Sequence, residues 1–330
     1  MEPLKLNLAD AVALDNKVAG HDGVLQDPTG SVVIKPSVAL EIEFYESLSA
    51  HVTFRQVVPP FYGVLELAEQ QTVVDVQSGD LRTTIGAERA IVLENVTAGF
   101  VKPSVIDVKL GRQLWDERAS HDKRKRLDDV SNKTTSGSLG LRIAGMKVWH
   151  AKDNKYRIFD KSYGRSLNDD TISNGIRDFI TIESVERQRV VVDKILKGIQ
   201  QIQQAVESEE SRMYSASILI AYETDPETFD IALHEENEPK DRFEGESEDE
   251  ELEFTVSETI EINGTLVKQV SISGAGEITV REDADEEEKP TVRVKLIDFA
   301  HATWVPGQGN DENALYGIRN LYRIFAEYNF

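Results

Sequence analysis

The sequence predicts an α+β fold, in which a sheet formed early in the chain is followed by long helices and further strands. Three observations support this class. Short apolar segments such as residues 32–35 and 89–96 lie between Gly and Pro breaks, as strands do. Apolar residues recur at near-helical spacing over residues 184–210. The 330 residues, 40% of them apolar, are enough for one large domain or two lobes around a sizeable core.

The elements follow from local periodicity and from turn residues. Besides the two strands already named, residues 61–67, 72–77, 102–111, 142–149, 217–223 and 292–302 are predicted strands. Helices are predicted over residues 38–48, 171–180, 184–210 and 313–328. Residues 254–280 alternate apolar and polar side chains around Asn263-Gly264, which predicts an inserted hairpin.

Composition excludes several classes of site. The chain has no cysteine, so disulfides, thiolate metal sites and cysteine nucleophiles are ruled out, and a reducing compartment is expected. A metal ion would have to be bound by carboxylate, hydroxyl or imidazole groups. No apolar run approaches the ~20 residues of a membrane span, and residues 1–10 have no secretory signal pattern.

The net charge of −22 is concentrated in two acidic runs. Residues 235–253 hold eleven acids against two bases, a net of −9, and residues 282–288 add −6. The rest of the chain therefore carries only −7. We expect both runs to be solvated loop, either a disordered insertion or a docking surface for a basic partner. Taken as a whole the charge argues against direct nucleic-acid binding.

A basic stretch has the opposite pattern. Residues 118–126 (RASHDKRKR) hold five bases against one acid, and Lys133 follows. On a helix Lys123 and Arg126 share a face. The stretch is either a solvated helix face or nuclear localisation patch, or a cradle for an anionic ligand.

Three features together match the kinds of charged group that a phosphotransferase site uses. Lys35 ends an early strand and is followed by a helix with Glu41 and Glu43. Asp107 and Lys109 alternate on a strand, so they project from one face. A late apolar strand ends in Asp298, followed closely by His301. Cations suit the charge of a transferring phosphoryl group, and carboxylates suit Mg²⁺. Each feature also has a plain structural interpretation: a surface lysine, a same-face ion pair, a helix cap or a hydrogen-bonded histidine.

The segment PSVIDVKLG (103–111) resembles the PxxxDxKxG signature of the inositol polyphosphate kinase family. Further segments resemble family blocks in order: AGHDG (19–23), IKP (34–36), EIEFYESL (41–48), VLENV (92–96), SGSLGLRIAGMKV (136–148), YGRSL (163–167) and LIDFAHA (296–302). The resemblance covers nearly the whole chain apart from residues 224–290. Within the family it is greatest to the fungal multikinases, which have an acidic tract at a similar place.

The resemblance implies a role for each matching residue, with ATP and Mg²⁺ as cofactors. The nucleotide-binding residues would be Lys35 and its partner Glu41, the hinge residues Glu94 and Val96, Asp107 and Asp298. Asp107 and Lys109 would be catalytic, and the His21-Asp22-Gly23 loop would cover the phosphates. The inositol phosphate would contact Lys109, Lys123, Arg126, Lys133 and His301. Asp298 would bind the metal, with Ser217 beside it, although the family's SSLL block here begins with Ala216.

The implied fold has two kinase-like lobes, residues 1–100 and 101–330. The second lobe would include a helical substrate-binding insert at 112–135 and the acidic insertion with its hairpin at 232–290. The expected activity is stepwise phosphorylation of inositol 1,4,5-trisphosphate in nucleus and cytoplasm. Two alternatives remain open: a hexakisphosphate kinase or trisphosphate 3-kinase, and a non-catalytic scaffold that binds transcription factors through the acidic tract. A phosphoinositide substrate would rest on family analogy alone.

Overall fold

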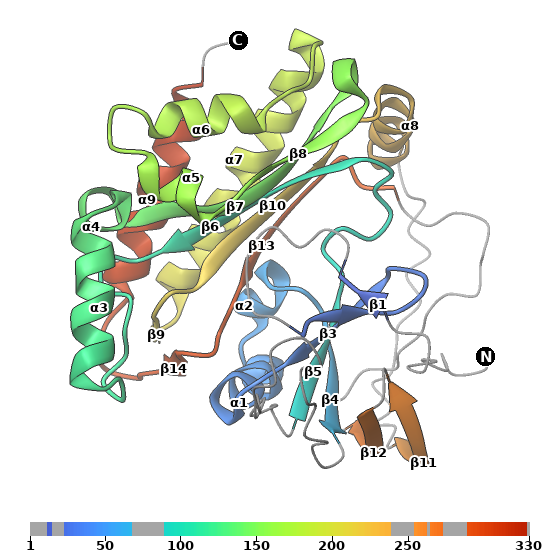
Figure 1. Ribbon diagram of the computed structural model, residues 1–330, viewed down its shortest axis with the longest axis vertical. Coiled ribbons are helices and arrows are strands. Elements are labelled where there is room, and N and C mark those ends of the chain that lie inside the picture. Colours follow the sequence, from blue (N-terminus) through green and yellow to red (C-terminus); the bar gives the residue numbers. More distant parts are fainter. Residues whose placement is uncertain are drawn as a thin grey trace, which may run out of the picture.

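Figure 1 shows the computed structural model of the chain, which describes residues 12–14, 23–67, 89–238, 254–262, 265–272 and 289–328. Two antiparallel sheets with flanking helices form its two parts. This arrangement confirms the predicted α+β class. Within the described segments, no helix has the length and apolar character needed to cross a membrane.

The first sheet has seven strands in the order β1-β2-β3-β5-β4-β12-β11. Their bounds are β1 (Val12–Ala13), β2 (Leu25–Gln26), β3 (Val32–Pro36), β4 (Phe61–Leu67), β5 (Arg89–Glu94), β11 (Phe254–Ile262) and β12 (Thr265–Ile272). Helices α1 (Ala39–Ser47) and α2 (Val52–Val57) follow β3. The predicted strand at 72–77 lies outside the described residues.

Strands β11 and β12 pair with each other, and β12 also pairs with β4. The sequence had assigned residues 232–290 to the second lobe, whereas this pairing adds the two strands to the edge of the first sheet. Long-range backbone pairing decides this placement, because an alternating strand pattern does not specify which sheet edge the strand joins.

The second sheet has five strands in the order β13-β10-β6-β7-β8. Their bounds are β6 (Pro103–Leu110), β7 (Leu141–His150), β8 (Lys155–Phe159), β10 (Ser217–Glu223) and β13 (Val292–Ile297). Helices α7 (Val185–Ser208) and α9 (Glu312–Ala326) pack behind the sheet. Along β6, Ile106 and Val108 belong to the core, so Asp107 and Lys109 point to the opposite face.

The remaining elements surround the second sheet. They are α3 (His121–Asn132), α4 (Thr135–Leu139), α5 (Lys161–Ser166), α6 (Ile172–Phe179), α8 (Pro226–Asn237), β9 (Ser211–Met213) and β14 (Ala302–Trp304). Helix α3 and the first residue of α4 lie within residues 112–135, where the resemblance implied a helical insert. Ser120 caps α3 by accepting a hydrogen bond from the Lys123 backbone N–H.

The first acidic run differs from its prediction as a solvated loop. Helix α8 extends into it, and Glu236 forms an ion pair with Lys194. Glu236 also accepts a 3.0 Å hydrogen bond from the Thr291 backbone N–H. Because these partners neutralise and hold Glu236, the start of the run is part of the fold. Residues 239–253 and 282–288 lie outside the described residues.

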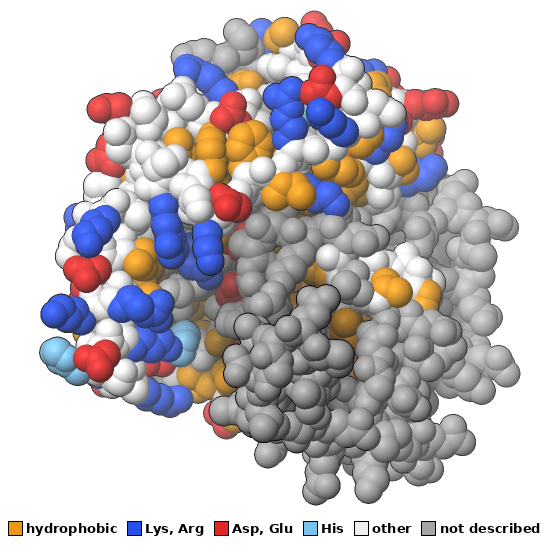
Figure 2. Space-filling view, in the orientation of Figure 1, with side chains coloured by type: hydrophobic (Ala, Val, Ile, Leu, Met, Phe, Trp, Pro, Cys, Tyr) orange, Lys and Arg blue, Asp and Glu red, His pale blue; other side chains and the backbone are white. Residues whose placement is uncertain are grey.

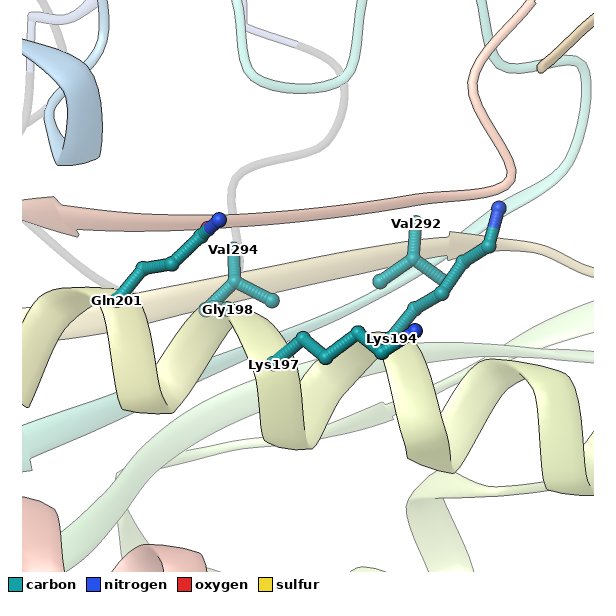
Figure 3. A pocket seen from close by; sticks show the side chains of 6 residues that line it. All are labelled: Lys194, Lys197, Gly198, Gln201, Val292 and Val294. Atoms are coloured by element: carbon teal, nitrogen blue, oxygen red, sulfur yellow. The ribbon is translucent and has the colours of Figure 1, made fainter. Parts of the chain in front are cut away.

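Lys194 also lines a shallow hollow between α7 and β13 (Figure 3). The hollow is lined by Lys194, Lys197, Gly198, Gln201, Val292 and Val294. Helix and strand approach closely here, since a Cβ added at Gly198 would lie 2.6 Å from the Val294 side chain. The hollow lies behind the second sheet and contains none of the residues expected to act on phosphate.

Candidate active site

Three charged side chains join the two sheets. Lys35 Nζ at the end of β3 lies 2.7 Å from Glu41 Oε1 on α1 and 2.8 Å from Asp298 Oδ1 after β13. The Lys35 and Glu41 side chains are 13% and 2% exposed. The predicted partnership of Lys35 with Glu41 is therefore present, whereas Glu43 on the same helix points to solvent.

Aromatic packing holds this group together. Phe299, next to Asp298, is fully buried and stacks on Phe44 of α1 with ring centroids 4.4 Å apart. Its backbone N–H donates a 3.1 Å hydrogen bond to Glu41 Oε1. The apolar neighbour of the aspartate thus fixes α1 against the end of β13, and the carboxylates and lysine are positioned as a consequence. Asp298 adopts a left-handed φ of +68°, which aspartate tolerates better than most residues.

The Asp107 and Lys109 pair lies beside this group. Lys109 Nζ is 3.3 Å from Asp298 Oδ2 and donates a 3.0 Å hydrogen bond to the Ser215 carbonyl oxygen. Asp107 is only 3% exposed, and its Oδ1 has no hydrogen-bond partner. A buried carboxylate oxygen without a partner is costly, and such groups are typical of sites that a ligand completes.

The pKa values of the two aspartates, Asp107 and Asp298, are shifted in opposite directions. Burial raises the pKa of Asp107 above its usual value, against the opposing effect of Lys109. Burial would also raise the pKa of Asp298, but Lys35 and Lys109 overcome it and hold that pKa well below the usual range. Burial would lower the pKa of Lys35, whereas Asp298 and Glu41 raise it far above the ordinary lysine value. Asp298 and Lys35 are therefore charged at neutral pH.

The oxygen groups at this place suit a hard divalent cation. Asp298 supplies a carboxylate, and Ser217 on the neighbouring strand supplies a fully buried hydroxyl that also interacts with Asp107. Among the described residues, no three His, Asp or Glu side chains cluster as a complete metal site. A cation bound here would need further oxygen ligands, which nucleotide phosphates provide.

On the other side of the site, α3 supplies cations. Lys123 Nζ lies 3.4 Å from His301 Nε2, and His301 Nδ1 lies 2.7 Å from Asp116 Oδ2. The structure thus brings together Lys123 and His301, both of which the resemblance implied as contacts of the inositol phosphate. Arg126 is exposed one turn further along α3. Lys133, exposed at the end of that helix, lies about 15 Å from Lys123 along the axis.

Figure 2 shows the consequence at the surface. Lys and Arg side chains gather over α3 and the neighbouring elements, with His side chains beside them. The acidic chain therefore carries a concentrated positive region next to its buried carboxylates, which suits a small and densely anionic ligand.

The predicted hinge follows β5. The Glu94 N–H donates to the Pro60 carbonyl at 2.9 Å, and Arg293 Nη1 lies 3.5 Å from Glu94 Oε1. Val96 is buried in a small apolar cluster separate from the main core. The other members of this cluster are Val105, Ala221, Phe100 and Leu219. An apolar surface beside backbone polar groups suits a flat heteroaromatic ring. His21 and Asp22 lie outside the described residues, and Gly23 has a φ of +87°.

Sequence reasoning missed several residues. Asp116 orients His301, and Ser37 Oγ donates to Glu41 Oε2 at 3.1 Å. Arg142 on β7 is 8% exposed on the face that carries Lys109. Only Arg142 left a sequence signal, as a single charge among the apolar residues that open its strand. Asp116 becomes recognisable only through its contact with His301, 185 residues away. Ser37 becomes recognisable only once the structure shows its hydrogen bond to the Glu41 side chain.

Comparison with known proteins decides the family. A family model described as inositol polyphosphate kinase matches residues 90–326. The chain belongs to the inositol polyphosphate kinase family. The PxxxDxKxG segment and the IDFAH segment both lie within the matched residues, and the structure brings them into contact through Lys109 and Asp298.

Two fungal members of the inositol polyphosphate kinase family match over nearly their full length. An inositol polyphosphate multikinase of Saccharomyces cerevisiae is 29% identical, over 96% of this chain and 98% of its own. An inositol polyphosphate multikinase of Schizosaccharomyces pombe is 27% identical, over 94% of this chain and 95% of its own. A crystal structure of an inositol phosphate multikinase from S. cerevisiae with ADP and Mn²⁺ has a TM-score of 0.63 at 28% identity, covering 90% of this chain and 98% of that one. The resemblance to fungal multikinases and the kinase-like fold are thereby confirmed.

Proposed function

We propose that this protein is an ATP-dependent inositol polyphosphate multikinase that converts inositol 1,4,5-trisphosphate to tetrakis- and pentakisphosphate with Mg²⁺. The observation that carries the proposal is the Lys35–Asp298–Lys109 group beside the unpartnered Asp107 Oδ1. Two lysines, one low-pKa carboxylate and one buried carboxylate are what phosphoryl transfer to a hydroxyl needs. The names of the two fungal relatives support the acceptor class.

In the proposed mechanism Lys35 binds nucleotide phosphates, and Glu41 holds Lys35 in place. The acceptor hydroxyl donates a hydrogen bond to Asp107 Oδ1. As the hydroxyl oxygen bonds to the γ-phosphorus, the bond to the ADP oxygen breaks, and the hydroxyl proton passes to Asp107. Lys109 stabilises the negative charge on the transferring phosphoryl oxygens. Asp298 and Ser217 would hold Mg²⁺, which when bound would neutralise charge at the nucleotide phosphates.

The remaining assignments follow the geometry. Val96 and its apolar cluster form the adenine surface, with Glu94 at the start of the hinge. Lys123, Arg126 and His301 bind acceptor phosphates, and Lys133 extends this cationic region along α3. These roles rest on position and on the family resemblance.

Chromatography of the products tests the activity. The purified protein is incubated with inositol 1,4,5-trisphosphate and ATP-Mg²⁺, and tetrakis- and pentakisphosphate are expected in succession. If neither product forms, the proposal is wrong. Hexakisphosphate serves as the second acceptor in parallel, because its preferred phosphorylation would identify the alternative, a hexakisphosphate kinase.

We further propose a second role in nucleus and cytoplasm, in which the acidic tract binds basic transcription factors. Its support is the charge of the tract alone. Because Glu236 forms part of the fold, the test deletes residues 239–253 and spares α8. The deletion is expected to leave turnover unchanged and to abolish partner binding. Asp298→Asn should have the reverse effect. Partner binding that survives the deletion would contradict this role.

A further inference from the structure

The segment that joins the two sheets carries an inference beyond these assignments. Residues 95–102 connect β5 of the first sheet to β6 of the second, and we call them the linker (Figure 1). The linker begins at the predicted hinge and includes Val96, which belongs to the proposed adenine surface. The contacts that hold the linker therefore decide where the nucleotide base lies relative to the residues that act on phosphate.

A buried glutamate binds the end of the linker. Glu223 is the last residue of β10 and is fully buried. Its Oε2 accepts a 2.7 Å hydrogen bond from the Val101 N–H, and its Oε1 accepts a 3.0 Å hydrogen bond from the Lys102 N–H. Oε1 also accepts a 2.8 Å hydrogen bond from the Asp225 N–H. Three backbone donors thus compensate the loss of water around this carboxyl group.

An arginine on the outermost strand of the second sheet binds the start of the linker. Nη1 of Arg293 on β13 lies 3.4 Å from the carbonyl oxygens of both Asn95 and Val96. The same nitrogen lies 3.5 Å from Glu94 Oε1, and the guanidinium carbon lies 5.8 Å from the centre of the Phe100 ring. The second sheet therefore binds the linker's carbonyl groups with a guanidinium at one end and its N–H groups with a carboxyl group at the other.

Strand register places Arg293 beside the proposed adenine surface. Arg293 pairs with Ala221 on β10, and Ala221 pairs with Val105 on β6. Cross-strand neighbours point to the same side of a sheet, and Ala221 and Val105 belong to the apolar cluster that contains Val96. Along the chain, Asp298 follows Arg293 by five residues, about 17 Å of extended backbone. One strand thus positions both the start of the linker and the candidate metal ligand.

The first sheet holds the linker only at its start, through Asn95, among the contacts of the described residues that we have identified. The Asn95 N–H donates to the Ser31 carbonyl at 2.8 Å, and its side-chain amide donates to the Gly30 carbonyl at 2.6 Å. Without Arg293 and Glu223 the base-binding surface would remain attached to the first sheet but would be free to shift against the second. Such a shift matters because reacting groups must be held in a fixed mutual geometry.

We propose that Arg293 and Glu223 are positioning residues for the nucleotide base, which act by holding the two ends of the linker against the second sheet. This inference rests on the proposed function in its use of ATP. The base contributes fully to affinity because its binding surface is already formed before the nucleotide arrives, so little ordering is left to be done on binding.

The test compares a ligand that has the base with one that lacks it. Binding of ADP and of inorganic pyrophosphate, each with Mg²⁺, is measured by calorimetry on wild-type protein and Arg293→Gln. The variant should bind ADP about tenfold more weakly, the usual cost of lost hydrogen bonds to a charged group, and should bind pyrophosphate like wild type. In turnover, the KM for ATP should rise by a similar factor, whereas kcat at saturating ATP and the KM for the trisphosphate should stay at their wild-type values.

Three further variants separate positioning from folding. Glu223→Gln keeps the shape of the side chain but replaces one acceptor oxygen by a donor, so it should show the same selective loss of ADP affinity with a lower melting temperature. Arg293→Lys keeps the charge without the planar donors and should retain part of the ADP affinity. Arg323→Gln, which alters surface contacts of α9 only, should bind both ligands like wild type.

Two results would overturn the inference. In one, Arg293→Gln weakens ADP and pyrophosphate by the same factor, which indicates a general structural role. In the other, Arg293→Gln binds ADP like wild type. Both leave the proposed function intact, because wild-type protein still phosphorylates the trisphosphate. If wild-type protein binds ADP but forms no inositol phosphate product, the proposed function is wrong, and the ADP comparison still decides the role of the two residues.

Discussion

The two flanks of the active site differ in how their charges are satisfied. On the nucleotide flank Lys35 forms ion pairs with both Glu41 and Asp298. On the acceptor flank Arg126 is exposed, and Arg142 is buried with no described carboxylate at ion-pair distance. The first flank is a complete network that sets geometry before any ligand arrives. The second holds cations with no carboxylate of the described residues at ion-pair distance, and an anionic ligand would neutralise them. Changes on the first should therefore affect turnover and stability together, and changes on the second should affect acceptor binding.

The largest effect is expected for Asp298→Asn. The change removes the carboxylate shared by Lys35 and Lys109, so kcat should fall about a thousandfold. The fall in kcat is measured by steady-state turnover of inositol 1,4,5-trisphosphate. Asp230→Asn, which alters only a surface pair with Arg187, is the matched control and should retain full activity. More than a tenth of wild-type turnover in Asp298→Asn would show that the assignment is wrong.

Next in size is Glu41→Gln. The buried Glu41 neutralises Lys35 and accepts the Phe299 N–H, so kcat/KM for ATP should fall about a hundredfold. Stability should decrease by about 3 kcal/mol, as for a broken buried pair. Kinetics and chemical denaturation measure the two effects. Glu43→Gln, on the exposed side of the same helix, should change neither, and equal effects of the two variants would contradict the network.

On the acceptor flank Lys123→Gln should raise the KM for inositol 1,4,5-trisphosphate about tenfold. The KM for ATP and the melting temperature should stay unchanged, because the Lys123 ammonium lies beside His301 on the acceptor side and forms no ion pair within 4 Å among the described residues. Lys125→Gln, exposed on the same helix, serves as control. If the KM for ATP changes instead, Lys123 contacts the nucleotide and its assignment to the acceptor is wrong.

The smallest effect concerns stability and its pH dependence at the two aspartates. Because the pKa of Asp107 is raised above 3.8, its ionisation destabilises the folded protein at higher pH. Asp107→Asn should therefore be more stable at pH 7, by about 1 kcal/mol or 2 °C in melting temperature. This gain should vanish below pH 3.8, where the carboxyl group is protonated in both states.

Asp298→Asn should behave in the opposite way. The pKa of Asp298 is depressed, so its ionised form contributes stability above pH 3.8 that is lost as the pH falls towards the folded value. Melting curves between pH 3 and 8 compare the two variants directly. If Asp107→Asn melts at a lower temperature than wild type at pH 7, the ionised Asp107 carboxylate does not destabilise the folded protein.

Local patterns were sufficient for much of the fold. Near-helical spacing predicted α7 and α9, and apolar segments predicted β3, β5, β6, β10 and β13. Helix α8 was missed although Asp225 caps it and Pro226 opens it, because the acidic residues that follow dominated the interpretation. An excess of like charge indicates a solvated loop only when no distant cation compensates it, and Lys194 does so here.

The sequence by itself determined the chemistry available to the site. The DxK alternation put Asp107 and Lys109 on one face, the charge count separated acidic runs from the basic stretch, and the family resemblance marked Asp298 and Lys35. Only the tertiary structure decided which of these charges satisfy one another. The Asp298 contacts with Lys35 and Lys109 span 263 and 189 residues of sequence, and Arg142 faces Lys109 only through the cross-strand register. Such contacts follow from how the two sheets and α1 pack, which local periodicity does not encode.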